Sequence, residues 1–228
     1  MKQGKFDKAV DINTSIKITS RGNPLAKQAS KSPPNSEDGK ELKVKQIVIS
    51  AILEALNDIV GPDGKDSIIK FAGLEKKYLG MYLRPSLRNW IPRSDLARLS
   101  RAMYRLMAWG SNAMLRETGR RFAIYLAPYG YSLKTVAKKL ENWIQGDLEI
   151  KIEKEDEDTL SITIIGDPFQ ADMPGGYMWM GFFEVAAANS SHDGSQYVAT
   201  DYHEEKEENA LTRFKLARVT NKNNKGKK

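Results

Sequence analysis

The sequence contains no cysteine and only two histidines, His192 and His203. Without cysteine the chain can form no disulfide, no thiolate nucleophile and no cysteine-based zinc site, which agrees with a cytoplasmic location. Two histidines argue against a histidine-rich metal site. We therefore expect no metal centre and in particular no zinc.

Long apolar runs and familiar catalytic motifs are also missing. No stretch of about 18 apolar residues is present, so we expect no membrane span, and the N-terminus lacks the apolar core of an export signal. The sequence has no nucleophile elbow, no phosphate-binding loop, no zinc-peptidase motif and no dinucleotide fingerprint. These absences favour a non-enzymatic protein, and no flavin or nicotinamide motif argues for a reductase.

The net charge of +7 is unevenly distributed. Residues 1–45 hold ten basic and five acidic residues, and residues 215–228 hold six basic residues and no acidic one. Residues 46–214 hold 20 basic and 24 acidic residues, so this part of the chain is acidic overall. Because the basic excess belongs to the ends, nucleic acid is not the partner we expect.

Composition and periodicity divide the chain into three parts. Residues 1–41 and 220–228 are basic and polar, which predicts disordered tails. Residues 42–219 form the predicted domain, whose apolar residues first recur at helical spacing and then alternate. Helices are predicted over 44–60, ending at Gly61-Pro62, over 67–81, and over 132–145. Strands are predicted in a hairpin over 148–165 and over 177–188, 196–202 and 211–219. This order predicts an α+β fold with N-terminal helices packed on a C-terminal antiparallel β-meander.

The longest helical pattern runs from Ser94 to Pro128. Ser94 is suited to be the N-cap, and apolar residues follow at three- and four-residue steps. We predict one helix to about Thr118, a break near Gly119, and a short helix to Leu126. A second face of the pattern carries arginines, which we call the arginine stripe. Its members are Arg98, Arg101, Arg105, Arg116 and Arg120, with Trp109 between them. It is either a solvated face, a protein interface or an anion contact.

Methionine and aromatic residues are concentrated in the Ser94 helix and in the predicted strand over 177–188. They either fill the core or line an adaptable apolar pocket. The candidate pocket residues are Met103, Met107, Met114, Phe122, Tyr125, Trp179 and Phe182. Two acidic features are weaker candidates. The run from Glu204 to Glu208 is typical of a solvated loop, with a hard-cation site as the alternative. Asp201 and His203 share one side of a predicted strand, where they could form a proton relay, two ligands of a weak metal site, or a plain cross-strand or surface pair.

The order of these segments resembles the four-vinyl-reductase (4VR) domain, within the fold group of NO-signalling and Golgi-transport ligand-binding proteins that includes TRAPP subunits. The resemblance is carried by ETGRRFAIYLAP, the hairpin, the Asp167-Pro168-Phe169 turn, YMWMGFFEV and Arg213-Phe214. It implies a dimeric α+β module with an apolar pocket. Where zinc-binding members have cysteine, this chain holds Asp167, Glu204 and Thr212, so zinc is not carried over.

Our hypothesis is a dimeric, non-enzymatic module that binds a hydrophobic or tetrapyrrole-like molecule between the Ser94 helix and the 177–188 segment. Two alternatives stay open. One is a scaffold or adaptor that binds protein partners through the arginine stripe and the basic tails. The other is an accessory factor or reductase component in bacteriochlorophyll or chlorophyll synthesis, as the 4VR resemblance implies.

Overall fold

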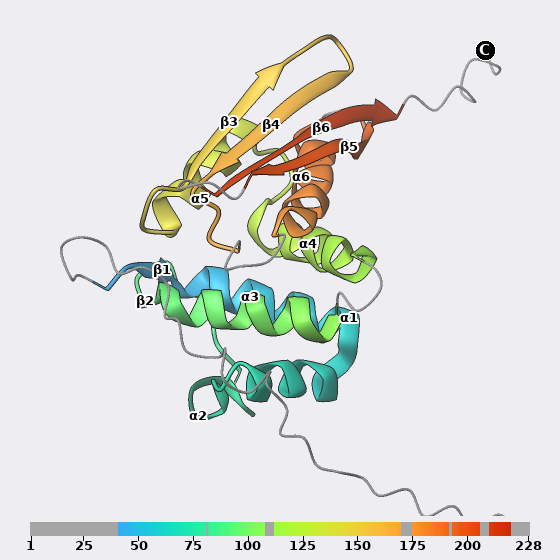
Figure 1. Cartoon of the computed structure of the whole chain (residues 1–228). Helices are drawn as coiled ribbons and strands as arrows, with labels where there is room; N and C mark the ends of the chain where they lie inside the picture. The colour runs from blue at the N-terminus through green and yellow to red at the C-terminus, as the bar shows by residue number, and fades with distance from the viewer. Residues whose placement is uncertain are drawn as a thin grey trace, which may run out of the picture. The chain divides into compact units, whose positions relative to one another are not determined.

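A computed structural model describes residues 41–80, 82–107, 112–169, 175–191, 193–205 and 210–219. These residues belong to one compact unit of the chain. Apart from Glu41, both predicted tails lie outside the described residues. In chain order (Figure 1) the elements are β1 (Lys43–Lys45), α1 (Gln46–Phe71), α2 (Glu75–Tyr78), β2 (Trp90–Pro92), α3 (Arg93–Met107), α4 (Ala113–Leu126), α5 (Leu133–Trp143), β3 (Glu149–Lys154), β4 (Thr159–Ile165), α6 (Gly176–Ser190), β5 (Gln196–Glu205) and β6 (Leu211–Val219).

The first helix turns back on itself at the predicted stop. Gly61 leaves the helical region with a φ of 71°, a conformation that glycine adopts without a side-chain penalty. Pro62 then begins the second half of α1, where a missing N–H costs nothing. Figure 1 shows the second half doubling back beneath the first. The prediction of a break at Gly61-Pro62 is therefore confirmed. The second helix was predicted over 67–81, but the second half of α1 ends at Phe71.

The Ser94 pattern forms two helices, and the predicted break near Gly119 is wrong. α3 ends at Met107 and α4 begins at Ala113, so Gly119 lies inside α4. A Cβ at Gly119 would collide with the backbone carbonyl oxygen of Met178 in α6. This glycine therefore allows close packing of two helices and does not end one.

The segment predicted as a strand over 177–188 is the helix α6, which corrects the prediction. Nearly every residue of this segment is buried, so its sequence YMWMGFFEVAAA is apolar on all sides and carries no period. A continuous apolar run cannot be assigned by periodicity, and its length and alanines favour a helix over a strand.

The sheet confirms the predicted hairpin and the last two strands. Its antiparallel order is β3-β4-β6-β5, with Ile150 opposite Ile164 and Ile164 opposite Thr212. The α+β class is therefore confirmed, with helices towards the N-terminus and strands towards the C-terminus. In the sheet the last strand, β6, lies between β4 and β5, and in the chain α6 connects β4 to β5.

Helix α5 begins as predicted. The Ser132 hydroxyl oxygen accepts from the Thr135 N–H at 3.2 Å, which satisfies one of the free donors in the first turn. After α5 the chain turns through Gly146, with a φ of 124°, and enters the hairpin.

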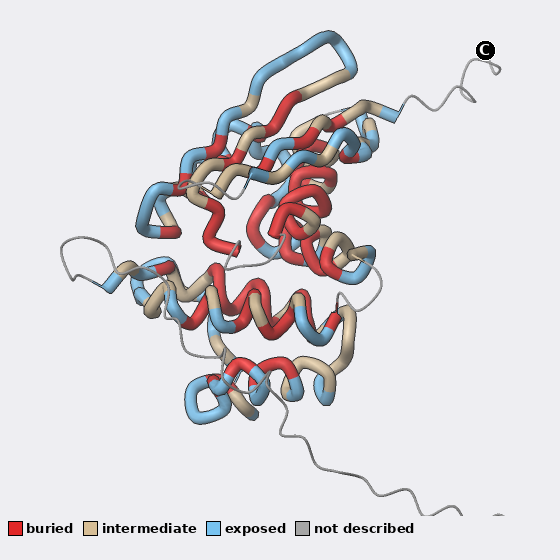
Figure 2. Tube along the Cα trace, in the orientation of Figure 1, coloured by how far each residue is buried: buried red, intermediate tan, exposed pale blue. Residues whose placement is uncertain are grey.

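The core joins α4, α6 and the sheet through aromatic rings. The Phe122 and Phe182 centroids lie 5.4 Å apart, and the Phe169 and Trp179 centroids lie 5.0 Å apart in an edge-to-face arrangement. Phe183 reaches Phe214 of β6 at 6.1 Å. Figure 2 shows buried backbone concentrated along α4, α6 and the facing side of α1 and α3. Among the described residues no helix has the length and apolar character needed to cross a bilayer.

Candidate functional site

The helices α4 and α6 cross closely, and two glycines permit this approach. Gly119 of α4 faces the Met178 carbonyl, and Gly181 of α6 faces the Arg116 carbonyl so closely that a Cβ at either position would overlap the opposite backbone. The helices therefore approach more closely than side chains on both surfaces would allow. This crossing fixes how the C-terminal helix meets the residues of the arginine stripe.

Glu184 of α6 is buried beside this crossing and is held by both helices and the sheet. Arg116 pairs with one carboxylate oxygen, the Arg120 Nε donates to the other at 2.8 Å, and the Ala199 N–H donates at 2.7 Å. Burial raises the pKa of Glu184, but the hydrogen bonds from Arg116, Ala199 and Arg120 outweigh burial and lower it overall. Glu184 is therefore an ionised anchor between α4, α6 and β5.

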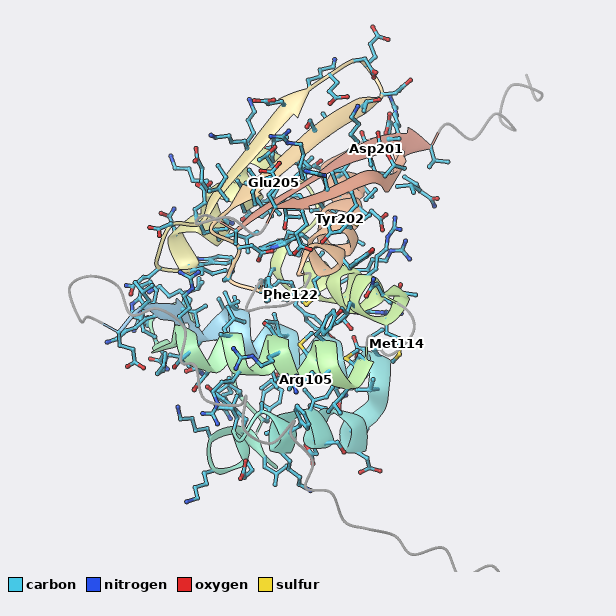
Figure 3. All side chains as sticks on the ribbon, in the orientation of Figure 1. Arg105, Met114, Phe122, Asp201, Tyr202 and Glu205 are labelled. Atoms are coloured by element: carbon cyan, nitrogen blue, oxygen red, sulfur yellow. The ribbon has the colours of Figure 1, made fainter. Side chains whose placement is uncertain are left out.

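The arginine stripe consequently does not form one surface. Arg116 and Arg120 are engaged by Glu184, and Arg98 donates to the Gly73 carbonyl after α1 at 2.6 Å. Arg101 is half-buried with interactions of its own, Arg105 is exposed on α3 (Figure 3), and Trp109 lies outside the described residues. The proposed role of the stripe as an interface or anion contact stays a prediction, and the Glu184 pairing was not foreseen from sequence.

The candidate pocket residues divide into core and surface. Met103, Met107, Phe122, Trp179 and Phe182 are buried, and Trp179 lies 5.9 Å from Phe182 between ring centroids. Met114 and Tyr125 are each 40% exposed on α4, and the Tyr125 hydroxyl donates to Asp58 of α1 at 2.9 Å. Figure 3 shows Met114 and Phe122 at separate places along α4. The rings of Phe122, Trp179 and Phe182 contact one another between α4 and α6, and their role as the lining of a ligand pocket stays a prediction.

A cavity of about 300 Å³ lies elsewhere, between the two halves of α1. Leu53 and Ile69 line it from the two halves, Tyr78 lines it from α2, and Tyr82 and Leu83 line it from the following segment. The sequence did not predict this cavity. The Gly61-Pro62 turn was the available signal, because it lets two halves of one helix face each other.

The polar lining of this cavity, which we call the α1 cavity, is mostly acidic. Glu54 of the first half and Asp66 of the second half line it together with one cation, Lys65. The Tyr78 hydroxyl is already committed, since it donates to the buried Asp95 at 2.8 Å, and Lys77 also pairs with Asp95 at 2.9 Å. Burial and Asp95 raise the pKa of Tyr78, so this hydroxyl stays protonated. The Tyr78 ring therefore lines the cavity, while the Tyr78 hydroxyl is bonded to Asp95.

Asp167 is a buried carboxyl group at the end of β4. Burial raises its pKa to about 6, while the nearby Trp179 indole and hydrogen bonds from the Phe169 N–H and the Thr212 hydroxyl oppose that rise. The Phe169 N–H donates to one Asp167 oxygen at 2.8 Å, and the Thr212 hydroxyl approaches the other at 3.4 Å. The Asp167-Pro168-Phe169 turn is thus closed by its own first residue, which is a structural role.

The expectation that Asp201 and His203 share one side of the strand is wrong for a geometric reason. A bulge lies between Thr200 and His203, and Asp201 has a φ of 52°, so the simple alternation of strand side chains fails there. His203 instead contacts Glu205 at 3.1 Å, and Asp201 lies 3.8 Å from Lys215. The acidic run from Glu204 lies partly outside the described residues.

Comparisons with known proteins identify the fold. No family model matches the chain, and no curated protein matches it. The matching solved structures include an oxygen-binding H-NOX domain related to soluble guanylate cyclases, at 15% identity and a TM-score of 0.52, covering 77% of this chain and 95% of that one. An H-NOX domain studied for its activation matches at 14% identity and a TM-score of 0.53, covering 77% and 97%. A structure from work on heme distortion in the H-NOX family matches at 16% identity and a TM-score of 0.50, covering 77% and 95%.

The class of fold is therefore that of H-NOX domains, and at this identity the likeness shows the fold alone. It overturns the 4VR assignment, because the structural neighbours are H-NOX domains and no family model supports the 4VR domain. The segments quoted for that resemblance were individually common, and one of them, YMWMGFFEV, was read as a strand although it forms α6.

The described residues do not fit a haem, the group named for one of these neighbours. A haem needs a vacant flat space and an axial donor, commonly His, Cys, Met or Tyr. The space between α4 and α6 is filled by rings in mutual contact. His203, the one histidine in the described part, is 61% exposed on β5 and contacts Glu205. Tyr78 is bonded to Asp95, and Tyr202 stacks on Tyr177 at 4.8 Å.

Proposed function

We propose that the protein is a non-enzymatic module of the H-NOX fold that binds a small amphipathic molecule in the α1 cavity. The observation that carries this proposal is the cavity itself. Its volume of about 300 Å³ lies at the lower end of ordinary ligand sites, and apolar walls with a few polar groups are typical of them. The small-molecule binding of the fold neighbours is compatible with this function.

The lining defines the chemistry of the ligand. Leu53, Ile69 and Leu83 suit an apolar body, and the Tyr78 and Tyr82 rings suit an aromatic one. Glu54 and Asp66 outnumber Lys65, so the cavity favours a positively charged head, and an ammonium group near tyrosine rings gains a further attraction. The ligand class we propose is a compact aromatic or aliphatic amine.

Three probes with similar bodies and different heads test this class. Isothermal titration calorimetry is performed with 2-phenylethylamine, 2-phenylethanol and 3-phenylpropionate. The amine is expected to bind most tightly and the carboxylate least. Equal binding of the three, or preference for the carboxylate, contradicts the proposed head group, and no heat with any probe contradicts the cavity as a site for such bodies.

Charge removal at the cavity supplies the matched control. Glu54→Gln and Asp66→Asn are each expected to weaken amine binding about twofold to fivefold, because partly exposed charge pairs contribute up to about 1 kcal/mol. Asp63→Asn, on the same segment of α1 and not among the lining residues, is expected to leave the affinity unchanged. An equal effect of all three variants would point to overall charge and not to the cavity.

A homodimer and a cytoplasmic location stay predictions. Exposed apolar residues at the end of α4 and in the next loop, Ile124, Tyr129 and Tyr131, support self-association. Native mass spectrometry of the purified chain measures the subunit number directly. A monomer at micromolar concentration would contradict the dimer. The scaffold interpretation also stays a prediction, while the bacteriochlorophyll role rested on the 4VR resemblance and is not carried forward.

A further inference from the structure

The strand β3 lies at one edge of the four-stranded sheet and leaves part of its backbone without a partner strand. The Ile150 N–H is directed away from β4, because it donates to the Glu141 carboxylate of α5 at 2.8 Å. Alternate residues of a strand repeat this direction, so the Ile152 N–H also points away from β4. The two residues on β4 that face Ile150 and Ile152 are Ile164 and Ile162.

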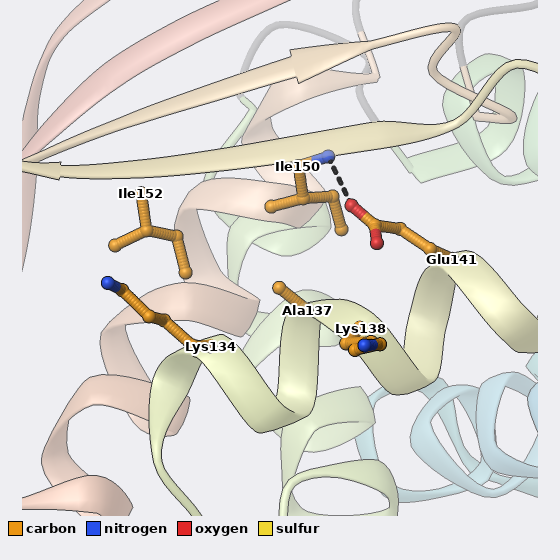
Figure 4. Close-up of a pocket in the computed structure, with 6 residues that line it drawn as sticks. All are labelled: Lys134, Ala137, Lys138, Glu141, Ile150 and Ile152. Carbon is orange, nitrogen blue, oxygen red and sulfur yellow. Dashed lines mark hydrogen bonds between the residues drawn. The ribbon is translucent and has the colours of Figure 1, made fainter.

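Helix α5 lies along this edge and forms a groove with it (Figure 4). The groove has a volume of about 170 Å³, with Ile150 and Ile152 on the strand side and Ala137 on the helix side. Lys134 lies beside Ile152, and Glu141 lies beside Ile150, so α5 and β3 run in opposite directions (Figure 4). The volume of the groove is below that of ordinary small-molecule sites.

The charges along the groove are mostly positive. Lys134 and Lys138 line it from successive turns of α5, and neither forms an ion pair with an acidic residue in the described part of the chain. Glu141 is the acidic residue of the lining, and its carboxylate is engaged by the Ile150 N–H. The groove thus presents two cations beside an apolar floor.

We infer that this edge, formed by β3 and α5, docks an extended acidic peptide segment of a partner protein by strand addition. A peptide carbonyl would accept from the Ile152 N–H, which is the role that the Glu141 carboxylate plays for Ile150. Four residues of a helix span about 6 Å, and two residues of a strand span about 6.6 Å. Acidic side chains at alternate peptide positions therefore match the spacing of Lys134 and Lys138.

The probe is a fluorescein-labelled peptide of sequence TVEVEVT, measured by fluorescence anisotropy with the full chain. The wild-type protein is expected to bind it, and TVKVKVT is expected to bind at least tenfold more weakly. Lys134→Glu with Lys138→Glu is expected to abolish binding of the acidic peptide. Lys76→Glu with Lys70→Glu, two exposed lysines outside the groove, is the control and is expected to leave it unchanged.

Strand addition is tested separately by Ile152→Pro. Proline removes one outward N–H, and an outward position on an edge strand is where a sheet tolerates proline. Circular dichroism checks that the variant keeps its fold, and Ile152→Ala controls for the lost side chain. Binding is expected to fall at least tenfold with proline and less than threefold with alanine. Equal binding of the acidic and basic peptides, or full binding by the Ile152→Pro protein, overturns the inference.

Discussion

At the level of single residues, the buried carboxylate of Glu184 explains why Arg116 and Arg120 share one face of α4. Glu184 receives hydrogen bonds from α4 and β5, and it holds α6 against both. The sequence showed that Arg116 and Arg120 share a helix face, but periodicity alone cannot say which carboxylate they meet. Their partner lies in α6, 68 residues after Arg116 and 64 residues after Arg120, inside a segment whose helical structure was not predicted.

Replacing Glu184 with glutamine is expected to lower the free energy of unfolding by about 2–3 kcal/mol, because two arginines lose their shared charge. The estimate lies below that for a fully buried pair, since Arg120 is 42% exposed. Urea denaturation at pH 7 measures it. Glu117→Gln removes an exposed pair with Arg120 and is expected to cost less than about 1 kcal/mol. Equal costs for the two variants would contradict the anchor.

Asp167 gives the molecule a specific pH dependence. Its pKa is raised from 3.8 to about 6, mainly by burial, so the folded state binds a proton that the unfolded state has released between these values. This contribution to stability is fully present below about pH 4 and is lost as the pH rises through 6. The loss is about 3 kcal/mol by linkage. The Asp167→Asn variant is expected to lack this loss when urea denaturation is measured from pH 4 to 7. If the unfolding free energies of the variant and the wild type fell equally over this range, the assignment to Asp167 would be contradicted.

At the scale of elements, the crossing of α4 and α6 depends on Gly119 and Gly181. At an uncrowded helical position alanine stabilises by about 1 kcal/mol over glycine. Here each new Cβ would overlap a backbone carbonyl, so Gly119→Ala and Gly181→Ala are each expected to destabilise by about 2–4 kcal/mol. Thermal denaturation followed by circular dichroism gives the sign. Stabilisation by either alanine would contradict the close crossing.

The elements that the sequence predicted well are those with one buried face. The hairpin, α5 with its Ser132 cap, and β6 alternate or recur clearly because each meets both core and solvent. The failures have physical causes. α6 is buried on nearly all sides and has no period, and the bulge at Asp201 breaks the alternation of β5. The α1 cavity depends on a helix folding back, which local pattern does not describe.

At the scale of the whole molecule, the fold of H-NOX domains is present without room for a haem among the described residues. Rings of Phe122, Trp179 and Phe182 occupy the space where the sequence predicted a ligand. Addition of hemin to the purified chain is therefore expected to give the Soret band of free hemin, unshifted by protein. A sharpened, shifted Soret band at one equivalent would contradict this account. The same titration with Phe182→Ala controls for a space opened by mutation.

The central claim is that a small molecule binds between the two halves of α1 and not between α4 and α6. A crystal structure of the chain soaked with 2-phenylethylamine tests it most directly. The account predicts electron density for the amine beside Leu53, Ile69 and Tyr78, with its nitrogen towards Glu54 or Asp66. Density for the probe among Phe122, Trp179 and Phe182, with the α1 cavity empty, would contradict it.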